Sequence, residues 1–251
     1  MDYFGQEDFR VRLDWGPAGA QACATDVSVV VDVLSFSTSV SVATERGMKV
    51  YPYPWNDHRA TAFAAEREAV LAVGRLEAVQ TAAVRAPSLS PAGLLRSHPA
   101  PRLVLPSPNG STIASALNST GSTVAIGCLR NARAAGLWVV AQLHAGRSIA
   151  LIAAGERWAS DASLRPALED HLGVGAIASQ LVSAGFGPVC SPETLAAAHL
   201  YNATPDLRNA LRNCVSGREL AARGFEEDVD VAAQLDAATG VPLLRESAFS
   251  I

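Results

Sequence analysis

Asp32 is an acidic residue at a position where burial of a charged carboxylate would cost free energy. Asp32 follows the β-branched run at residues 27–31 and lies near the end of a predicted buried strand over residues 27–34. A carboxylate in such a place is destabilising unless it is paired, hydrogen-bonded or bound to a metal. Asp32 is therefore the first candidate for a functional residue. The alternative is a buried Asp that accepts backbone N–H groups from the loop after the strand.

Two further acidic groups lie near predicted helix starts. Glu169 and Asp170 fall in the first turns of a helix whose Gly173 and Gly175 would allow close packing on a neighbour, which favours burial. Adjacent residues of a helix project about 100° apart, so at most one of the two acids is expected to face a given point. A partnership with the helix dipole is the alternative for both. The other group, residues 226–228, is expected to cap the helix after it or to lie on a solvated face.

Small hydroxyl residues and an Asn-Gly pair follow two predicted strands and open two predicted helices. Such residues can cap a helix, and they can also offer hydroxyl, amide and backbone N–H donors to an anion such as phosphate. Capping alone is the alternative for either segment, and two such segments at one edge of a sheet favour an anion site. The candidates are Ser35, Ser37, Thr38, Asn109, Gly110 and Ser111.

Two more segments follow predicted strands. In an open parallel sheet, ligands bind outside the carboxyl ends of the strands, because loops and helix starts with unpaired N–H groups gather there. This rule selects Arg130 and Asn131 after one strand, and Gly155 and Glu156 after another. Either Arg130 or Arg165 could bind a second acidic group of a substrate.

The elements expected to position these residues alternate between strand and helix. Strands separated by single helices imply parallel pairing, because antiparallel neighbours need only a hairpin and the chain has few hairpin signals. We therefore predict an α/β fold: a mostly parallel sheet flanked by helices (α/β/α), with a helix-rich C-terminal part. The predicted strands cover residues 9–15, 27–34, 48–53, 70–73, 102–105, 123–127, 148–153 and 241–244, and the predicted helices cover 37–46, 57–68, 110–117, 131–144 and most of 165–235.

The length of 251 residues allows one large domain or two small ones, at roughly 150 residues per domain. We predict a single α/β unit over residues 1–251, with two closely packed sub-domains as the alternative. Their junction would lie near residues 74–101, where four prolines interrupt the pattern and an irregular crossover is expected.

Composition excludes several classes of protein. With 49% hydrophobic and 18% charged residues, the chain is too apolar to be disordered. A net charge of −4 argues against a broad nucleic-acid or membrane-binding surface.

The cysteines lack zinc-site spacing, which predicts free thiols in a reducing compartment. No signal peptide or membrane-spanning apolar run is recognisable, so the cytoplasm is the expected location. Dinucleotide, P-loop, zincin and hydrolase-elbow motifs are missing from the sequence.

Six segments carry a more specific pattern when they are taken in order. They are residues 30–34 with the Ser/Thr run after them, 108–111, 130–132, 154–156, 168–176 and 216–228. Their order and spacing resemble those of the ComB-like 2-phosphosulfolactate phosphatases. The resemblance implies an α/β fold, a bound Mg²⁺ near the acidic residues, and hydrolysis of a phosphate ester on a small acidic three-carbon molecule, as in coenzyme M biosynthesis.

The chain departs from that family at two places that concern arginine. The family commonly has Arg directly after Asp-Val-Leu, where this chain has Ser35. Its nearest match to the family's Gly-Glu-Arg segment is Val73-Gly74-Arg75. An anion site that lacks one Arg loses a bidentate contact that neither Lys nor Ser replaces.

We therefore predict an Mg²⁺-dependent phosphatase acting on 2-phosphosulfolactate or a similar small acidic phosphate ester. Asp32, Glu169 and Asp170 would hold the metal directly or through water, and Asp32, Asn109 and Glu169 would form the catalytic group. The residue types leave open whether water or a carboxylate attacks phosphorus. The predicted substrate-binding residues are Ser35, Ser37, Thr38, Asn109, Gly110, Ser111, Arg130, Asn131, Gly155, Glu156 and Arg165.

The expected partner is this small phosphorylated substrate, with no nucleic acid and no membrane, and a homodimer is an allowed assembly. The alternative function is a catalytically inactive relative that binds or senses a small anion.

Overall fold

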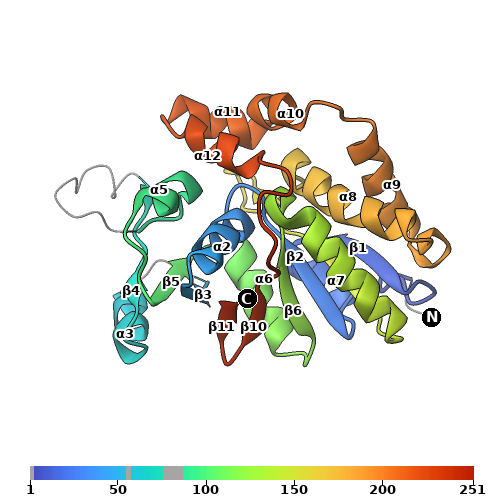
Figure 1. The fold of residues 1–251 in the computed structure, drawn as a ribbon, viewed down its shortest axis with the longest axis horizontal. Helices are drawn as coiled ribbons and strands as arrows, with labels where there is room; N and C mark the ends of the chain where they lie inside the picture. The colour runs from blue at the N-terminus through green and yellow to red at the C-terminus, as the bar shows by residue number, and fades with distance from the viewer. Residues whose placement is uncertain (1–2, 55–57, 76–86) are drawn as a thin grey trace.

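A large central sheet organises the molecule. The structure, a computed structural model, describes residues 3–54, 58–75 and 87–251. Within these ranges, nine strands form one sheet in the order β1-β7-β2-β6-β10-β11-β3-β5-β4, with helices on its faces (Figure 1). The strands are β1 (Val11–Trp15), β2 (Val27–Val31), β3 (Lys49–Tyr53), β4 (Val70–Leu71), β5 (Arg102–Pro106), β6 (Thr123–Gly127), β7 (Ile149–Ala153), β10 (Leu243–Arg245) and β11 (Ala248–Ser250).

The sheet consists of two parallel blocks joined by an antiparallel hairpin. Strands β1, β7, β2 and β6 pair in parallel, and so do β3, β5 and β4. Between the blocks, β10 pairs antiparallel with β6, and β11 pairs antiparallel with β3. The predicted mostly parallel α/β sheet is therefore confirmed. The strand predicted at residues 241–244 appears as β10, shifted by one to two residues, and the chain then turns back into β11, which was not predicted.

The turn of this hairpin carries no recognisable signal. Glu246 and Ser247 form it with φ angles of 50° and 68°, both in the left-handed region. Two-residue hairpin turns of this kind usually contain Asn-Gly or Gly-Gly, because those residues adopt positive φ at little cost. A Glu-Ser pair is not a sequence signal for such a turn. The hairpin is stabilised instead by the pairing of its two strands with β6 and β3.

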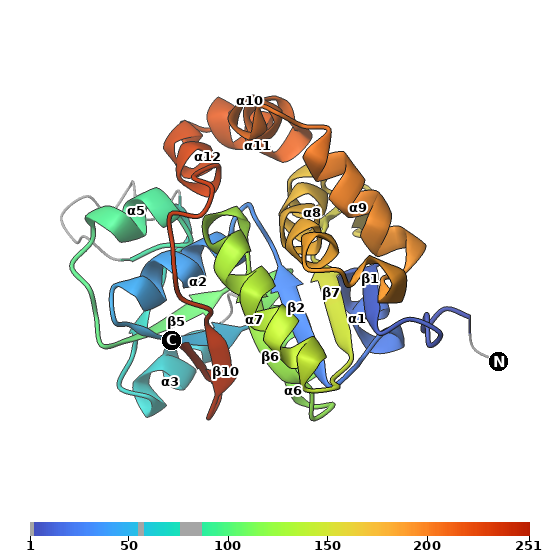
Figure 2. The same cartoon turned by 45° about the vertical axis from the view of Figure 1, so that its right-hand side comes forward.

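The helices cover both faces of the first parallel block. Helices α7, α8 and α9 pack on one face, and α1 and α6 pack on the other (Figures 1 and 2). Among the described residues, no helix combines the length and apolar character that a membrane crossing requires. The helices are α1 (Gly16–Ala22), α2 (Phe36–Glu45), α3 (His58–Glu66), α5 (Pro91–Arg96), α6 (Gly110–Asn118), α7 (Ala132–His144), α8 (Leu168–Ser183), α9 (Pro192–Asn202), α10 (Leu207–Asn213), α11 (Val215–Ala222) and α12 (Glu226–Ala232).

Two predicted segments are only partly described. The expected helix over residues 57–68 appears as α3, and residue 57 lies outside the described residues. Within the expected crossover at 74–101, the described part contains α5, whose first turn is capped by the hydroxyl of Ser90 accepting the Gly93 N–H. Residues 76–86 lie outside the described residues. Helix α1 was not predicted, because its Gly-, Ala- and Pro-rich sequence has no amphipathic period.

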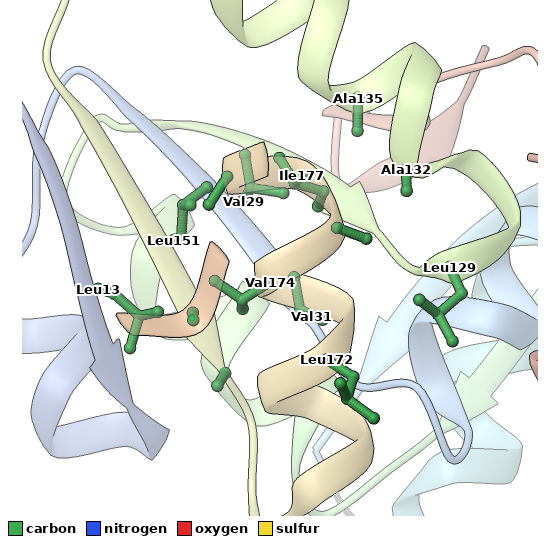
Figure 3. Packing of buried hydrophobic residues seen from close by; sticks show 14 of the residues in the cluster. Leu13, Val29, Val31, Leu129, Ala132, Ala135, Leu151, Leu172, Val174 and Ile177 are labelled. Atoms are coloured by element: carbon green, nitrogen blue, oxygen red, sulfur yellow. The ribbon is translucent and has the colours of Figure 1, made fainter. Parts of the chain in front are cut away.

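Strand β2 is buried on both faces. Val29 and Val31 belong to the core beneath α8, whereas Val30 belongs to the core on the opposite face. Figure 3 shows Val29 and Val31 close to Val174 and Ile177 of α8. This confirms the two-sided burial predicted from the β-branched run. Any polar group at the end of β2 is consequently surrounded by protein.

Helices α10, α11 and α12 run over the edge at which β2 passes into α2 (Figure 2). They connect α8 and α9 at one side to α5 at the other, where α12 packs on α5. The helix-rich C-terminal part that the sequence predicted is confirmed, and its position brings it close to the residues that follow the parallel strands.

Helix α8 approaches β2 closely because residue 173 is Gly. A Cβ atom on Gly173 would lie 2.7 Å from Cγ2 of Val33 and 2.8 Å from Cγ1 of Val31, both too short for ordinary contact. This confirms the close packing expected from Gly173, and it fixes the depth at which the first turn of α8 lies.

We expect Gly173→Ala to lower the free energy of unfolding by about 1–3 kcal/mol, because the added methyl group must displace two valines of a close-packed core. The gain of roughly 1 kcal/mol that Ala usually brings inside a helix would be outweighed. Urea unfolding would measure the loss. In a double-mutant cycle, Val33→Ala should relieve part of it, and strictly additive losses would contradict this contact.

Candidate active site

Polar residues from four parts of the chain meet at the carboxyl edge of the sheet. Asp32 follows β2, Gly110 opens α6 after β5, Gly155 follows β7, and Asp170 lies in the first turn of α8. Hydrogen bonds between backbone N–H groups and the two carboxylates join these parts directly. The convergence of distant segments that the sequence predicted is therefore present.

The carboxylate of Asp32 accepts a backbone N–H at each oxygen. Oδ1 accepts from the N–H of Phe36 at 3.0 Å, and Oδ2 accepts from the N–H of Gly110 at 2.9 Å. The first bond is the one expected of a merely structural Asp at a strand end. The second comes from a segment 78 residues away, and it fixes the start of α6 against the end of β2.

Gly110 is required by this approach. A Cβ atom at residue 110 would lie 2.8 Å from Oδ2 of Asp32 and would also collide with the ring of Phe36. The Asn-Gly pair predicted to start a helix therefore has a second purpose, because only a residue without a side chain lets the backbone reach the carboxylate.

Asp170 joins the loops after β2 and β7. Its Oδ1 accepts the N–H of Val33 at 2.7 Å, and its Oδ2 accepts the N–H of Gly155 at 2.8 Å. Gly155 has a φ of +65°, and a Cβ there would lie 2.7 Å from a methyl carbon of Leu164. Asp170 thus holds two neighbouring strand ends in register with the first turn of α8.

Glu156 and Asn109 form a further contact at this edge. Nδ2 of Asn109 donates to Oε2 of Glu156 at 3.0 Å. Glu156 belongs to a short hairpin, β8 (Glu156–Arg157) and β9 (Leu164–Arg165), in which it pairs with Arg165. Nη2 of Arg165 donates to the hydroxyl of Ser216 in α11 at 3.2 Å, so the hairpin is tied to the C-terminal helices.

Glu169 is buried beside Asp170 in the first turn of α8. Its neighbour from the C-terminal helices is Cys214, which lies between α10 and α11. Burial, with the charge and hydrogen bond of Glu169, raises the pKa of the Cys214 thiol to about 12. Both acids of the pair are buried, as expected from the close packing that Gly173 and Gly175 allow, and the expectation that at most one of them faces a given point stays a prediction.

The carboxylates at this edge raise one another's pKa. Burial raises the pKa of Asp32 to about 6, and the negative charge of Glu169 adds to the rise. Burial and the charge of Asp32 raise the pKa of Glu156 to about 7. Burial, with the charges of Asp32 and Glu169, holds the pKa of Asp170 well above its usual range. The charges of Arg75 and Arg165 oppose these rises at Asp32 and Glu156 respectively.

Three of the hydroxyls predicted to bind an anion are bonded to the protein's own backbone. Ser37 donates to the carbonyl of Val30 and Thr38 to that of Val33. Ser111 donates to the carbonyl of Leu105 at 3.1 Å. Each hydroxyl braces a strand-to-helix turn in this way, as the capping alternative expected, and a phosphate-binding role for the three stays a prediction.

Arg130 and Asn131 make their contacts away from the carboxylates. The guanidinium of Arg130 donates to Glu45 at the end of α2, at 3.1 Å, and to Gln234 after α12. The side chain of Asn131 accepts the N–H of Cys128 and donates to the carbonyl of Ile126. These bonds connect the end of β6 to its surroundings, and the predicted substrate contacts of both residues stay predictions.

Two residues at this edge were not selected from the sequence. Arg75 donates from Nε to Oδ2 of Asp228 at 2.8 Å and from Nη2 to the hydroxyl of Ser35. The sequence predicts a helix cap or a solvated face for Asp228, and the residue is instead buried. Because Arg75 follows β4, the rule that selects loops at carboxyl ends of strands would have identified it, had it been applied to this short strand.

The carboxylates fit a hard cation in their chemistry, although they do not form a complete metal centre. Among the described residues, no group of three or more His, Cys, Asp and Glu side chains is arranged to hold a metal ion. The predicted three-ligand set of Asp32, Glu169 and Asp170 is therefore not found as such, and both oxygens of Asp32 and of Asp170 receive backbone N–H groups. Mg²⁺ nevertheless commonly binds through one or two carboxylates, with phosphate and water oxygens completing its shell.

We expect the stability of the metal-free protein to fall as the pH rises from about 4.5 to 7. In this window the folded state retains protons on Asp32 and Glu156, with pKa values of about 6 and 7, that the unfolded chain releases near 3.8 and 4.5. The folded state therefore binds more protons, and the free energy of unfolding declines with pH.

Between about pH 4.5 and 7, Glu156→Gln should reduce the loss in the free energy of unfolding by on the order of 1–3 kcal/mol. The free energy of unfolding near pH 4.5 should stay unchanged. Urea unfolding with a chelator present, at a series of pH values, would measure both slopes. Glu66→Gln on the exposed surface of α3 is the control, and it should keep the wild-type slope. Equal slopes in all three proteins would show that Glu156 is not buried among like charges.

The sequence was compared with models of protein families and with curated proteins, and one family model matches it. A family model described as 2-phosphosulpholactate phosphatase matches residues 17–247, nearly the whole chain. No curated protein matches the chain at a significant level. Proteins of this family are phosphoric monoester hydrolases, which act on small phosphorylated substrates. The match covers the parallel strands apart from β1 and all of the C-terminal helices, and the chain therefore belongs to the 2-phosphosulpholactate phosphatase family.

Proposed function

We propose that this protein is an Mg²⁺-dependent phosphatase of the cytoplasm that hydrolyses 2-phosphosulfolactate, or a similar small three-carbon phosphate ester with a second acidic group, to the hydroxy acid and phosphate. The observation that carries the proposal is the gathering of mutually repulsive carboxylates at one edge of the sheet, where Asp32, Glu169 and Asp170 are buried and Glu156 is partly buried. Bringing such carboxylates together costs free energy unless a counter-charge is present, and a divalent cation would offset that cost.

Asp32 and Glu169 are the carboxylates that would hold the cation, with water and a phosphate oxygen as its other partners. When bound, Mg²⁺ would neutralise charge on the phosphoryl oxygens and lower the pKa of a bound water. Asp170 supports this arrangement because its bonds to Val33 and Gly155 keep the loop of Asp32 and the loop of Glu156 in place.

The residues around Asp32 would orient the phosphate and handle its proton. Helix α6 starts at Gly110, so its first turn presents backbone N–H groups near Asp32, where negative charge is stabilised. Glu156, with a pKa of about 7, can hold or release a proton at neutral pH, and its bond from Asn109 fixes the position of that carboxyl group.

Arg165 would bind the second acidic group of the substrate. Arg165 pairs with Glu156 across the β8–β9 hairpin, and its charge opposes the rise of the Glu156 pKa that burial causes. The bond to Ser216 and the ring of Trp158, 5.8 Å from its guanidinium carbon, orient the side chain. A guanidinium held in this way matches the planar geometry of a carboxylate or the oxygens of a sulfonate.

We expect Asp32→Asn to reduce hydrolysis by about 10²- to 10³-fold, because the change removes a negative charge from the centre of the cluster and retains the shape of the side chain. Release of inorganic phosphate from a panel of phosphorylated three-carbon acids, with Mg²⁺, would measure the rate.

Asp26→Asn is a matched control for this variant. Asp26 precedes the opposite end of β2, where it accepts hydrogen bonds from the N–H and hydroxyl of Ser148. The control should hydrolyse the same esters at the wild-type rate. Saturable binding of these esters to the wild type without turnover would instead favour an inactive anion-binding relative.

Arg165→Gln should raise KM by about tenfold for esters that carry a second acidic group, and should change it little for esters without one. Arg157→Gln is the matched control, because Arg157 lies in the same hairpin and donates to the carbonyl of Ala162. Equal effects of Arg165→Gln on both kinds of ester would remove the assigned specificity role.

A further inference from the structure

Arg75 is held on several sides at the edge where the carboxylates meet. Its Nε donates to Asp228 of α12, its Nη2 donates to Ser35 of the loop after β2, and its guanidinium carbon lies 6.0 Å from the centre of the Phe225 ring. The side chain nevertheless keeps 17% of its surface exposed, whereas that of Asp228 keeps 1%. Arg75 is therefore oriented by the protein and still accessible to a ligand.

Asp228 is the residue that fixes this orientation. Besides the bond from Arg75, its Oδ1 accepts the hydroxyl of Ser90 and the N–H of Ala92 at 3.1 Å. These partners come from the start of α5, so a single buried carboxylate joins α12, α5 and Arg75. A carboxylate with so many donors does not need to rearrange, and it holds the guanidinium fork in one direction.

The neighbouring ion pair between α5 and α12 provides a contrast. Arg96 and Glu227 also connect these two helices, yet their side chains are 66% and 64% exposed. An exposed pair of this kind contributes little to stability and positions nothing. A buried pair is costly to desolvate, and on stability alone apolar residues would serve as well at residues 75 and 228.

Arg75 lies close to Asp32 through the loop after β2. Ser35, which accepts a hydrogen bond from Arg75, directly precedes Phe36, whose N–H binds Asp32. The charge of Arg75 also opposes the rise of the Asp32 pKa that burial causes. Arg165, in contrast, has its charge beside Glu156. The two arginines thus lie beside different carboxylates of the cluster.

We propose that Arg75 binds the phosphoryl group of the substrate beside Asp32, and that Asp228 is the positioning residue that directs the guanidinium toward it. The inference rests on the proposed function and extends it by assigning the phosphate end of the substrate to Arg75 and the second acidic end to Arg165. Ser35 then supports the side chain of Arg75.

The test uses the affinity of the full-length protein for inorganic phosphate in the presence of Mg²⁺, measured by calorimetry and as competitive inhibition of hydrolysis. The variant Arg75→Gln/Asp228→Asn removes both charges together, so that no unpaired buried charge remains. We expect it to bind phosphate about ten- to a hundredfold more weakly, because a charge-assisted contact is lost. Its affinity for a phosphate-free hydroxy acid should stay as in the wild type.

Arg96→Gln/Glu227→Gln is the matched control, because it neutralises the exposed pair between the same helices and should leave phosphate affinity unchanged. Asp228→Asn alone should weaken phosphate binding while leaving the affinity for the phosphate-free acid unaltered, which a purely structural role would not do. Arg75→Lys keeps a charge for Asp228 but not the fork, so it should weaken phosphate binding even if the double variant does not fold.

Phosphate affinities within twofold of the wild type in Arg75→Lys, or in a folded Arg75→Gln/Asp228→Asn variant, would overturn the inference. Failure of the proposed function would give a different result. In that case the wild type would hydrolyse none of the phosphorylated acids, while its phosphate binding would still depend on Arg75.

Discussion

Two buried carboxylates that each accept two backbone N–H groups hold together the edge of the sheet at which the polar residues meet. Asp32 binds the N–H groups of Phe36 and Gly110, and Asp170 binds those of Val33 and Gly155. The four bonds connect the ends of β2 and β7 with the starts of α6 and α8. Backbone donors are rigid, so the carboxylates keep their positions despite their mutual repulsion, and the remaining polar residues of the edge are placed relative to them.

The same arrangement explains why the edge is electrostatically expensive. Burial and like charges raise the pKa values of Asp32, Glu156 and Asp170, and Arg75 and Arg165 compensate only in part. Groups that stability alone would not bring together indicate a binding site, for which we propose a cation and a phosphate as ligands. The C-terminal helices take part, because they place Cys214 beside Glu169, Ser216 beside Arg165, and Asp228 beside Arg75.

Much of the fold and the place of the site could be predicted because their signals are local. The β-branched run before Asp32 identified a strand buried on both faces, and alternating strands and helices identified the parallel blocks. The rule for carboxyl ends then selected the segments at Asp32, Gly110 and Glu156. The hairpin β10–β11 was missed, because its Glu-Ser turn adopts positive φ without glycine and is held by pairing with β6 and β3.

By itself, the sequence determined which residues lie near the ends of strands, since hydrophobic periodicity and turn residues act over a few positions. The tertiary structure decided which of them meet and where their side chains point. Arg75 and Asp228 are 153 residues apart, and no local pattern relates them. The hydroxyls of Ser37 and Ser111 donate to backbone carbonyls, because a buried donor needs an acceptor within reach. Which acceptor lies within reach is determined by the packing of the chain.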